Sequence, residues 1–324
     1  MADKENGLSQ SLDERETELY DRQIRLWGVE AQQRMGSSKV LFAGVHAVSM
    51  EVAKNLVLAG ISATLQDDEL MTAADIGANC LARLEDVGKN RAEACRPRVQ
   101  ELNLLAAVDS VTKPLAALDD VFLRCYNVVC LCGAPLAQQR RVDAACRRLG
   151  LFFYAVETFG YDGYVFCDLF RHAHRVEAGQ KLSDPVLRNY ASLDDAISAP
   201  WATLKDRWGP VPRVFVWAQL LLAFEARHGH RPRCGDTADV TAMEELCAAR
   251  LEAEGLPLEL VTRADLGRLC AAARAEVAPV CAVLGGIVGQ EVLKTISQKG
   301  TPTDNVFVFD GLSGEGKTFR APKR

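Results

Sequence analysis

The chain has 324 residues, of which 48% are hydrophobic and 25% charged, and this globular composition excludes a wholly disordered protein. At about 150 residues per domain, the length predicts two domains or one large α/β unit with an insertion. The net charge is −5, of which residues 1–20 carry −4, so the rest has no basic excess for nucleic acid phosphates. The longest mainly apolar stretches, 214–224 and 278–289, are shorter than the ~18 residues of a membrane span. We therefore expect neither nucleic acid nor a membrane as a partner.

The first predicted element is a helix that begins at a capping-box spacing between Ser11 and Glu14 and ends at Gly28. Its large apolar side chains fall on one stripe at 100° per residue: Tyr20, Ile24 and Trp27. Arg22 and Arg25 lie together on nearly the opposite side. This spacing predicts a helix held down by its aromatic side chains, with two guanidinium groups facing outward. Residues 1–10, before it, have no apolar stretch typical of a secretory signal and are expected to form a disordered acidic tail.

From residue 39 onward, strands and helices alternate. The predicted strands are 39–43, 62–66, 107–111, 128–132 and 151–156. The predicted helices between them are 48–59, 90–102 and 138–149, with a kink or a split expected at Pro97. This alternation is typical of an α/β fold with a Rossmann-like, doubly wound, mostly parallel sheet that has helices on both faces.

The pattern loosens after residue 166. Residues 171–212 are polar and contain four prolines, which indicates an insertion or a small subdomain. Later predicted helices are 214–227, 240–254, 263–276 and 279–298, and the last predicted strand is 306–310. Three glycines in the helix 279–298 would let another backbone approach closely: Gly285, Gly286 and Gly289. We expect a Rossmann-like domain at 11–166, an insertion or helical subdomain at 167–262, and a return to the first fold at 263–324.

A nucleotide would bind at the turn after the first strand, where the Gly-x-Gly-x-x-Gly pattern lets backbone amides approach phosphate. Residues 44–49 keep only the first of these glycines, Gly44. Each added Cβ would push a ligand away from the amides, which favours a nucleotide fold without a working nucleotide site. Asp67, 23 positions after Gly44, stands where an acid would hold ribose hydroxyls, and its role is left open between ligand binding and structure.

A second phosphate-binding pattern lies near the end of the chain. Residues 311–318 satisfy the P-loop pattern, but only six residues follow, and one of them is Pro322. No helix can therefore form after the loop, and we interpret the match as chance. Basic residues of this region are candidates for a nuclear address or for a solvated tail: Lys317, Arg320, Lys323 and Arg324.

The cysteines and histidines give no clear catalytic or metal site. Eleven cysteines without a Cys-x-x-Cys pair argue against a zinc finger or a disulfide framework and favour a reducing compartment. Cys130 and Cys132 alternate onto one face of a strand and are expected in the core, because no base or helix terminus stands nearby to activate them. The pairs His172–His174 and His228–His230 are predicted in loops, where surface histidines are commoner than metal ligands. We predict no metal site.

Six segments resemble the ubiquitin-like-protein activating enzymes. They are 20–28, 53–60, 87–94, 159–164, 278–286 and 307–311. The resemblance covers both ends and most of the chain except 170–212 and 228–262. It implies a ThiF/MoeB-type adenylation fold with a small insertion, in a family that pairs two related folds of which one is active.

The chain departs from the pattern of the active fold at two places. The family's ATP-contacting stretch falls on 75–79 and lacks its arginine, and the magnesium-binding aspartate falls on Ala134. Lys89 matches the ATP-site lysine, so a degenerate site is expected around Gly44, Asp67 and Lys89. The resemblance thus implies a pseudo-adenylation fold with no cofactor and no metal of its own, and ATP and Mg²⁺ in a partner subunit.

Arg22 matches the family's arginine that reaches across the dimer into the partner's ATP site, and Arg25 is a second candidate contact. The length and the lack of a large cysteine domain favour the smaller, non-catalytic subunit of a heterodimer that activates SUMO. The implied partners are the catalytic subunit and SUMO, with enzyme activity only in the heterodimer. The expected location is the nucleus, with the cytoplasm as a second location. The alternatives are the same subunit for another ubiquitin-like modifier, and a self-sufficient homodimeric adenylating or NAD-binding enzyme.

Overall fold

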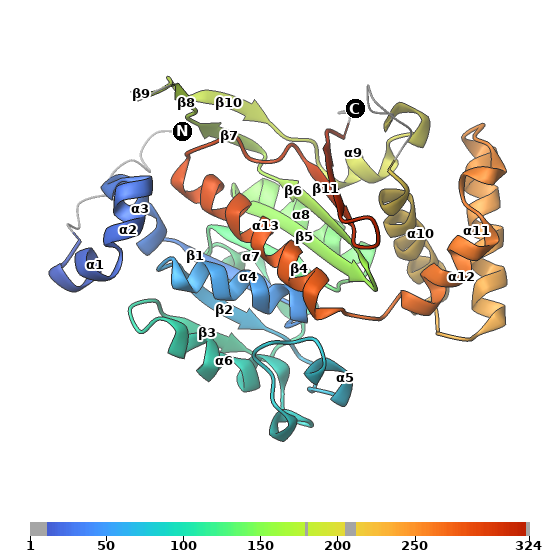
Figure 1. The fold of residues 1–324 in the computed structure, drawn as a ribbon, viewed down its shortest axis with the longest axis horizontal. Helices are drawn as coiled ribbons and strands as arrows, with labels where there is room; N and C mark the ends of the chain where they lie inside the picture. The colour runs from blue at the N-terminus through green and yellow to red at the C-terminus, as the bar shows by residue number, and fades with distance from the viewer. Residues whose placement is uncertain (1–11, 179–180, 205–211, 322–324) are drawn as a thin grey trace.

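The computed structural model describes residues 12–178, 181–204 and 212–321. The predicted tail 1–10, the expected cap Ser11 and the terminal bases Lys323 and Arg324 lie outside the described residues. The chain forms an α/β structure around one large sheet, with helices on both of its faces (Figure 1).

The sheet has eight strands in the order β12-β11-β6-β5-β4-β1-β2-β3. Five parallel strands form one part: β1 (Lys39–Ala43), β2 (Ser62–Gln66), β3 (Val108–Val111), β4 (Val128–Cys132) and β5 (Phe152–Phe159). Three strands extend it in antiparallel fashion: β6 (Asp162–Asp168), β11 (Val306–Asp310) and β12 (Glu315–Phe319). Every residue of β4 is buried, as expected for a central strand covered on both faces. The predicted Rossmann-like, mostly parallel sheet is confirmed.

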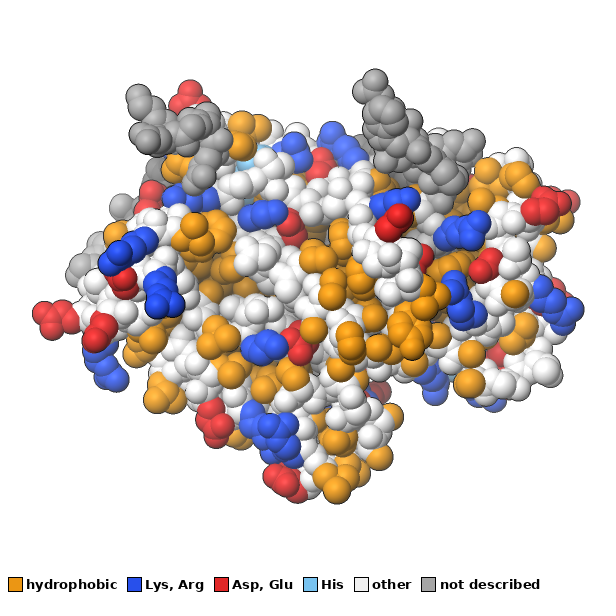
Figure 2. All heavy atoms as spheres, in the orientation of Figure 1, with side chains coloured by type: hydrophobic (Ala, Val, Ile, Leu, Met, Phe, Trp, Pro, Cys, Tyr) orange, Lys and Arg blue, Asp and Glu red, His pale blue; other side chains and the backbone are white. Residues whose placement is uncertain are grey.

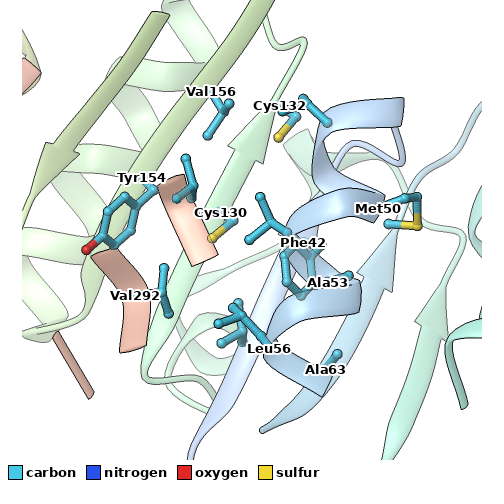
Figure 3. Packing of buried hydrophobic residues seen from close by; sticks show 14 of the residues in the cluster. Phe42, Met50, Ala53, Leu56, Ala63, Cys130, Cys132, Tyr154, Val156 and Val292 are labelled. Atoms are coloured by element: carbon cyan, nitrogen blue, oxygen red, sulfur yellow. The ribbon is translucent and has the colours of Figure 1, made fainter. Parts of the chain in front are cut away.

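Helices cover both faces of the sheet. One face carries α4 (Ala47–Leu58), α6 (Arg91–Leu102) and α13 (Ala278–Ser297). The other carries α8 (Leu136–Leu149), α9 (Leu193–Ser198), α10 (Arg213–His228), α11 (Thr237–Ala253) and α12 (Arg263–Ala272). Figure 3 shows part of the apolar layer between the sheet and the helices on this first face. Phe42 of β1 and Tyr154 of β5 belong to the sheet side, and Met50 and Leu56 of α4 and Val292 of α13 belong to the helix side. The helices of the segment 167–262 therefore belong to the apolar layer on the other face of the same sheet.

Short elements complete the described chain. They are α1 (Glu14–Leu19), α2 (Asp21–Trp27), α3 (Val29–Gly36), α5 (Ala73–Ile76), α7 (Asp120–Leu123), β7 (Arg171–His174), β8 (Glu177–Ala178), β9 (Lys181–Leu182) and β10 (Val186–Asn189), with 3₁₀ turns at Leu84–Asp86, Leu115–Ala117, Trp201–Leu204 and Leu258–Leu260. β7 pairs with β10, and β8 pairs with β9. In Figure 1, α1 to α3 lie at the left edge, and α10 to α12 lie at the right.

The long helices α4 and α13 cross at the predicted glycines. A Cβ at Gly285 would lie 2.3 Å from the Cβ of Glu51, and one at Gly289 would lie 3.0 Å from that of Asn55. Gly286 faces open space, so the expected close approach holds for two of the three glycines. Among the described helices, α13 alone has the length and composition of a membrane span, and 67% of that window is buried inside the protein.

The predicted first helix is two helices. Asp13, rather than Ser11, is the N-cap of α1, and it forms a capping box with Glu16. The chain turns at Tyr20, whose buried side chain accepts a 2.8 Å hydrogen bond from Asn103 far along the sequence. This tertiary contact ends α1 before α2 begins. Pro97, by contrast, does not split α6, which runs as one helix.

The structure shows which elements contain two patterns from the second half of the sequence, the pair His172–His174 and the P-loop-like residues 311–318. His172 and His174 lie in β7, each only 2% exposed, so their prediction as surface loop residues was wrong. Burial lowers the pKa of both, and His172 Nε2 lies 3.0 Å from the carbonyl oxygen of Thr295. The P-loop-like residues 311–318 form the turn and most of the second strand of the β11–β12 hairpin, and the described residues after them, 319–321, form no helix. Among the candidate nuclear-address bases, Lys317 and Arg320 pair with nearby carboxylates.

Two buried carboxyl groups under α9 predict a pH-dependent stability. Asp143 accepts the backbone N–H of Leu193 at 3.0 Å and lies beside Asp168, which binds Arg147. Burial, with the charge of Asp168 second, raises the pKa of Asp143 to about 8. The folded state therefore holds a proton that the unfolded chain releases at lower pH.

The free energy of unfolding is expected to fall as pH rises from the ordinary carboxyl range to about 8, by at most about 1.4 kcal/mol per pH unit. Asp143→Asn should flatten this dependence. Urea denaturation across that pH range measures the free energy of unfolding of the wild type and of Asp143→Asn. An equal slope in the wild type and in Asp143→Asn would contradict the assignment.

Candidate functional site

The turn from β1 into α4 is where a nucleotide phosphate would bind in this fold, and we call residues 44–49 the cradle. A cavity of about 310 Å³ opens beside it, and its lining includes Gly44, His46, Asp67, Arg91 and Ala134. Gly44 has φ +89°, and a Cβ there would lie 2.2 Å from the carbonyl oxygen of Cys132. This glycine is therefore required by the packing of β1 against β4, independently of any ligand.

Three consecutive amides of the cradle, those of Val45, His46 and Ala47, are bound by the chain's own side chains. The N–H of Val45 donates to Asp67 Oδ2 at 2.7 Å, and that of His46 donates to Ser49 Oγ at 2.9 Å. The N–H of Ala47 lies 3.2 and 3.3 Å from the two carboxylate oxygens of Glu276. These are the donors that would hold a phosphate at a helix N-terminus. A carboxylate of the protein stands in the place of that anion.

Glu276 reaches α4 because the preceding helix ends early. The sequence predicts a helix over 263–276, but α12 ends at Ala272 and the chain continues toward the cradle. The carbonyl of Ala275 accepts the N–H of Gly160 on the way, at 2.8 Å. Glu276 is 229 positions from Ala47, so no local pattern could have indicated the contact.

The side chain of His46 fills further space at the cradle. A Cβ at Gly133 would lie 2.2 Å from His46 Nε2, which shows how closely the imidazole covers the loop after β4. The Nδ1 atom of His46 is 3.9 Å from Glu276. A second cavity of about 370 Å³ shares His46 with the first and continues toward Glu157 and Arg231.

Asp67 is engaged in local structure. Besides Val45, its carboxylate accepts the N–H of Glu69 at 2.9 Å, and it lies 3.9 Å from Arg91. Arg91 also pairs with Glu69 at 2.7 Å and Asp75 at 3.2 Å, so three carboxylates surround its charge. The cation that lines this cavity is thus neutralised by the protein itself.

Lys89 lies apart from the cradle. Its Nζ is 3.3 Å from Asp86, and it is absent from the described residues that line either cavity. Ala134, where the resemblance places a magnesium-binding aspartate, contributes only a methyl group to the first cavity. The described residues contain no group of three or more His, Cys, Asp or Glu side chains that could hold a metal ion. Cys130 and Cys132 lie in the core as predicted, and burial raises the pKa of both thiols.

Arg22 lies at the other end of α4. It is the second residue of α2, its side chain is exposed, and no described residue forms a hydrogen bond or an ion pair with it. The next residue, Gln23, donates to the carbonyl of Leu58 in the last turn of α4. The 12 residues of α4, about 18 Å, therefore separate the helix of Arg22 from its own cradle. Arg25 is exposed but pairs with Asp21 at 3.0 Å.

Comparison with known proteins identifies the family. The family described as ThiF matches residues 20–324. The chain belongs to the ThiF family. Its sequence is similar to SUMO-activating enzyme subunit 1 of Xenopus tropicalis and of Homo sapiens, with 34% identity to each over 98% of both chains. SUMO-activating enzyme subunit 1 of Dictyostelium discoideum is 30% identical over 96% of this chain and 95% of that protein.

Among solved structures, the crystal structure of selenomethionine PaaA has a TM-score of 0.62 and 18% identity, covering 97% of this chain and 86% of that one. This likeness shows the fold alone. The resemblance predicted from six segments is confirmed, and the relatives extend it across nearly the whole ThiF-family chain.

Proposed function

We propose that this chain is the non-catalytic subunit of a heterodimeric SUMO-activating enzyme. The catalytic partner adenylates the C-terminal glycine of SUMO with ATP and Mg²⁺ and then holds SUMO as a thioester on its own cysteine. This chain contributes Arg22 and a dimer surface. The observation that carries the proposal is the cradle in which the N–H groups of Val45, His46 and Ala47 bind the chain's own side chains. The similarity to SUMO-activating enzyme subunits supports the choice of modifier.

The chemistry of adenylation supports the inactive role. Pyrophosphate leaves only if cations and a metal compensate the charge that develops on the phosphates. At this cradle the anion position is taken by Glu276, and the charge of Arg91 is taken by neighbouring carboxylates. A triphosphate would have to displace the carboxylate of Glu276 and separate Arg91 from its carboxylate partners.

The surroundings of Arg22 support action on another subunit. A guanidinium fixed on an outward helical face can bind phosphate oxygens with two parallel hydrogen bonds. Arg22 has no partner among the described residues, and its own cradle lies beyond the length of α4. An arginine in this position is available to a phosphate held by a second protein.

Exposed apolar side chains support the presence of a dimer surface. Figure 2 shows hydrophobic side chains gathered near the β11–β12 hairpin and the amino end of α13. Tyr161 of the β5–β6 turn, Val283 of α13 and Leu312 of the β11–β12 turn are 54%, 42% and 57% exposed. An apolar patch of this kind on a soluble protein marks an interaction site.

The proposal is tested with the purified chain alone and with its catalytic partner. The chain alone is expected to show no ATP–pyrophosphate exchange and no ATP·Mg²⁺-dependent rise in melting temperature, because its cradle cannot accept a triphosphate. Chain plus partner is expected to exchange pyrophosphate in the presence of SUMO. Exchange by the isolated chain would overturn the inactive role and would restore the self-sufficient enzyme as the alternative.

A further inference from the structure

The C-terminal end of α4 is capped by side-chain amides from three other segments. Asn103 Nδ2 donates to the carbonyl of Val57 at 2.9 Å, and Gln23 Nε2 donates to that of Leu58 at 3.3 Å. Gln32 Nε2 donates to the carbonyl of Ala59 at 3.1 Å. The last carbonyls of a helix lack the usual helical partners, and three consecutive ones each accept a side-chain amide here, although that of Val57 also accepts the N–H of Gly60 at 3.0 Å. We call Gln23, Gln32 and Asn103 the amide clamp.

The clamp joins α2 and α3 to α4. Gln23 belongs to α2, Gln32 belongs to α3, and Asn103 follows α6. The second hydrogen of the Asn103 amide goes to the hydroxyl of Tyr20, the residue between α1 and α2. Gly60 leaves room for this hydroxyl, since a Cβ there would lie 2.8 Å from it.

Arg22 lies between two anchored residues. Tyr20 accepts a hydrogen bond from Asn103 and Gln23 donates one to Leu58 at the end of α4, while Arg22 between them is exposed and bonds to no described residue. Gln32, 1% exposed, fixes the following helix in the same way. Hydrogen bonds of neutral amides therefore fix α2, the helix that carries Arg22, and α3 to the end of α4.

We infer that the amide clamp is a set of positioning residues for Arg22 in the reaction of the partner subunit. The inference rests on the proposed function of Arg22. A guanidinium that must meet phosphate oxygens in a transition state acts only when it is held in place, and a displacement of about 1 Å can cost about 10²-fold in rate. Loosening the clamp would let the helix move while Arg22 keeps its charge.

The experiment uses the assembled heterodimer with SUMO. Gln23→Met and Gln32→Met keep the shape of the side chain and remove the donor. Each is made alone and together with Arg22→Ala. The turnover number of ATP–pyrophosphate exchange is expected to fall about tenfold in the double variant Gln23→Met/Gln32→Met, with an unchanged KM for SUMO. In the Arg22→Ala background the same two changes should have no further effect on the turnover number.

Gln219→Met is the matched control. Gln219 Oε1 accepts a 2.6 Å hydrogen bond from Trp201 Nε1 on the other side of the sheet, so this change removes a buried bond of similar kind. It is expected to lower the melting temperature and to leave the turnover number unchanged. A structural role alone would give the clamp variants this same behaviour.

The outcomes separate the inference from the proposed function. If Arg22→Ala slows exchange but the clamp variants do not, the clamp inference is overturned and the role of Arg22 stands. Losses that multiply in the Arg22→Ala background also overturn it, because they show an effect independent of Arg22. If Arg22→Ala itself exchanges at the normal rate, the proposed role of Arg22 fails and the clamp inference fails with it.

Discussion

Replacement of Arg22 by alanine in the heterodimer is expected to slow adenylate formation by about 10³-fold while the two subunits remain assembled. The rate falls because a fixed guanidinium no longer meets the charge on the phosphates as pyrophosphate leaves. The fold should be unaffected, since the Arg22 side chain is exposed and bonds to no described residue. Single-turnover formation of the SUMO adenylate measures the first effect, and size-exclusion chromatography of the complex measures the second.

Two companion variants sharpen this test. Arg22→Lys keeps the charge but loses the planar pair of donors, so it should recover only part of the rate. Arg25→Ala removes a cation that already pairs with Asp21, and a much smaller loss is expected from it. Normal adenylate formation by Arg22→Ala would remove Arg22 from the mechanism. A loss with Arg25→Ala as large as with Arg22→Ala would make Arg25 a second contact.

The strands could be predicted from the sequence where burial alone decides them. β1, β2 and β4 begin and end at the predicted residues, and in β1 and β4 this is because a strand covered on both faces leaves an apolar run. β5 extends three residues beyond its predicted end, since 157–159 lie past the end of β4 but still pair with β6 on the other side. That pairing depends on a neighbour in space, which a local pattern does not report.

The predicted helix ends were wrong where a group distant in sequence determines them. The break at Tyr20 depends on Asn103, 83 positions away. The early end of α12 allows Glu276 to bind the amino end of α4. Local spacing favours a longer helix in both cases, and the competing interaction is tertiary.

The candidate site was located by sequence but could not be completed from it. The missing glycines indicated a weak cradle, and Gly44 and Asp67 both line its cavity as expected. The reason that the cradle is filled, the carboxylate of Glu276, belongs to a segment with no motif. The clamp was missed as well, although Gln23 lies within the resembling segment 20–28, because an amide next to an arginine gives no sign of its partner.

The second large effect concerns stability. Glu157 in β5 is 5% exposed and pairs with Arg231 at 2.9 Å, and Arg231 also binds Glu225 at 3.1 Å. Burial raises the pKa of Glu157, and the charge of Arg231 opposes that rise. Arg231→Met would leave Glu157 charged and unpaired in the interior. The free energy of unfolding is expected to fall by about 3–5 kcal/mol, measured by urea denaturation near pH 8.

The pH dependence of this loss identifies its cause. Without Arg231, the pKa of Glu157 rises further, so the folded variant takes up a proton that the unfolded chain does not bind at the same pH. The destabilisation should therefore be smaller near pH 5 than near pH 8. Arg231→Met combined with Glu157→Gln removes the unpaired charge of Glu157 and leaves only that of Glu225, so a large part of the lost stability should return at pH 8. A deficit that is equal at both pH values, and equal in the double variant, would indicate lost packing around Arg231 and not a buried charge.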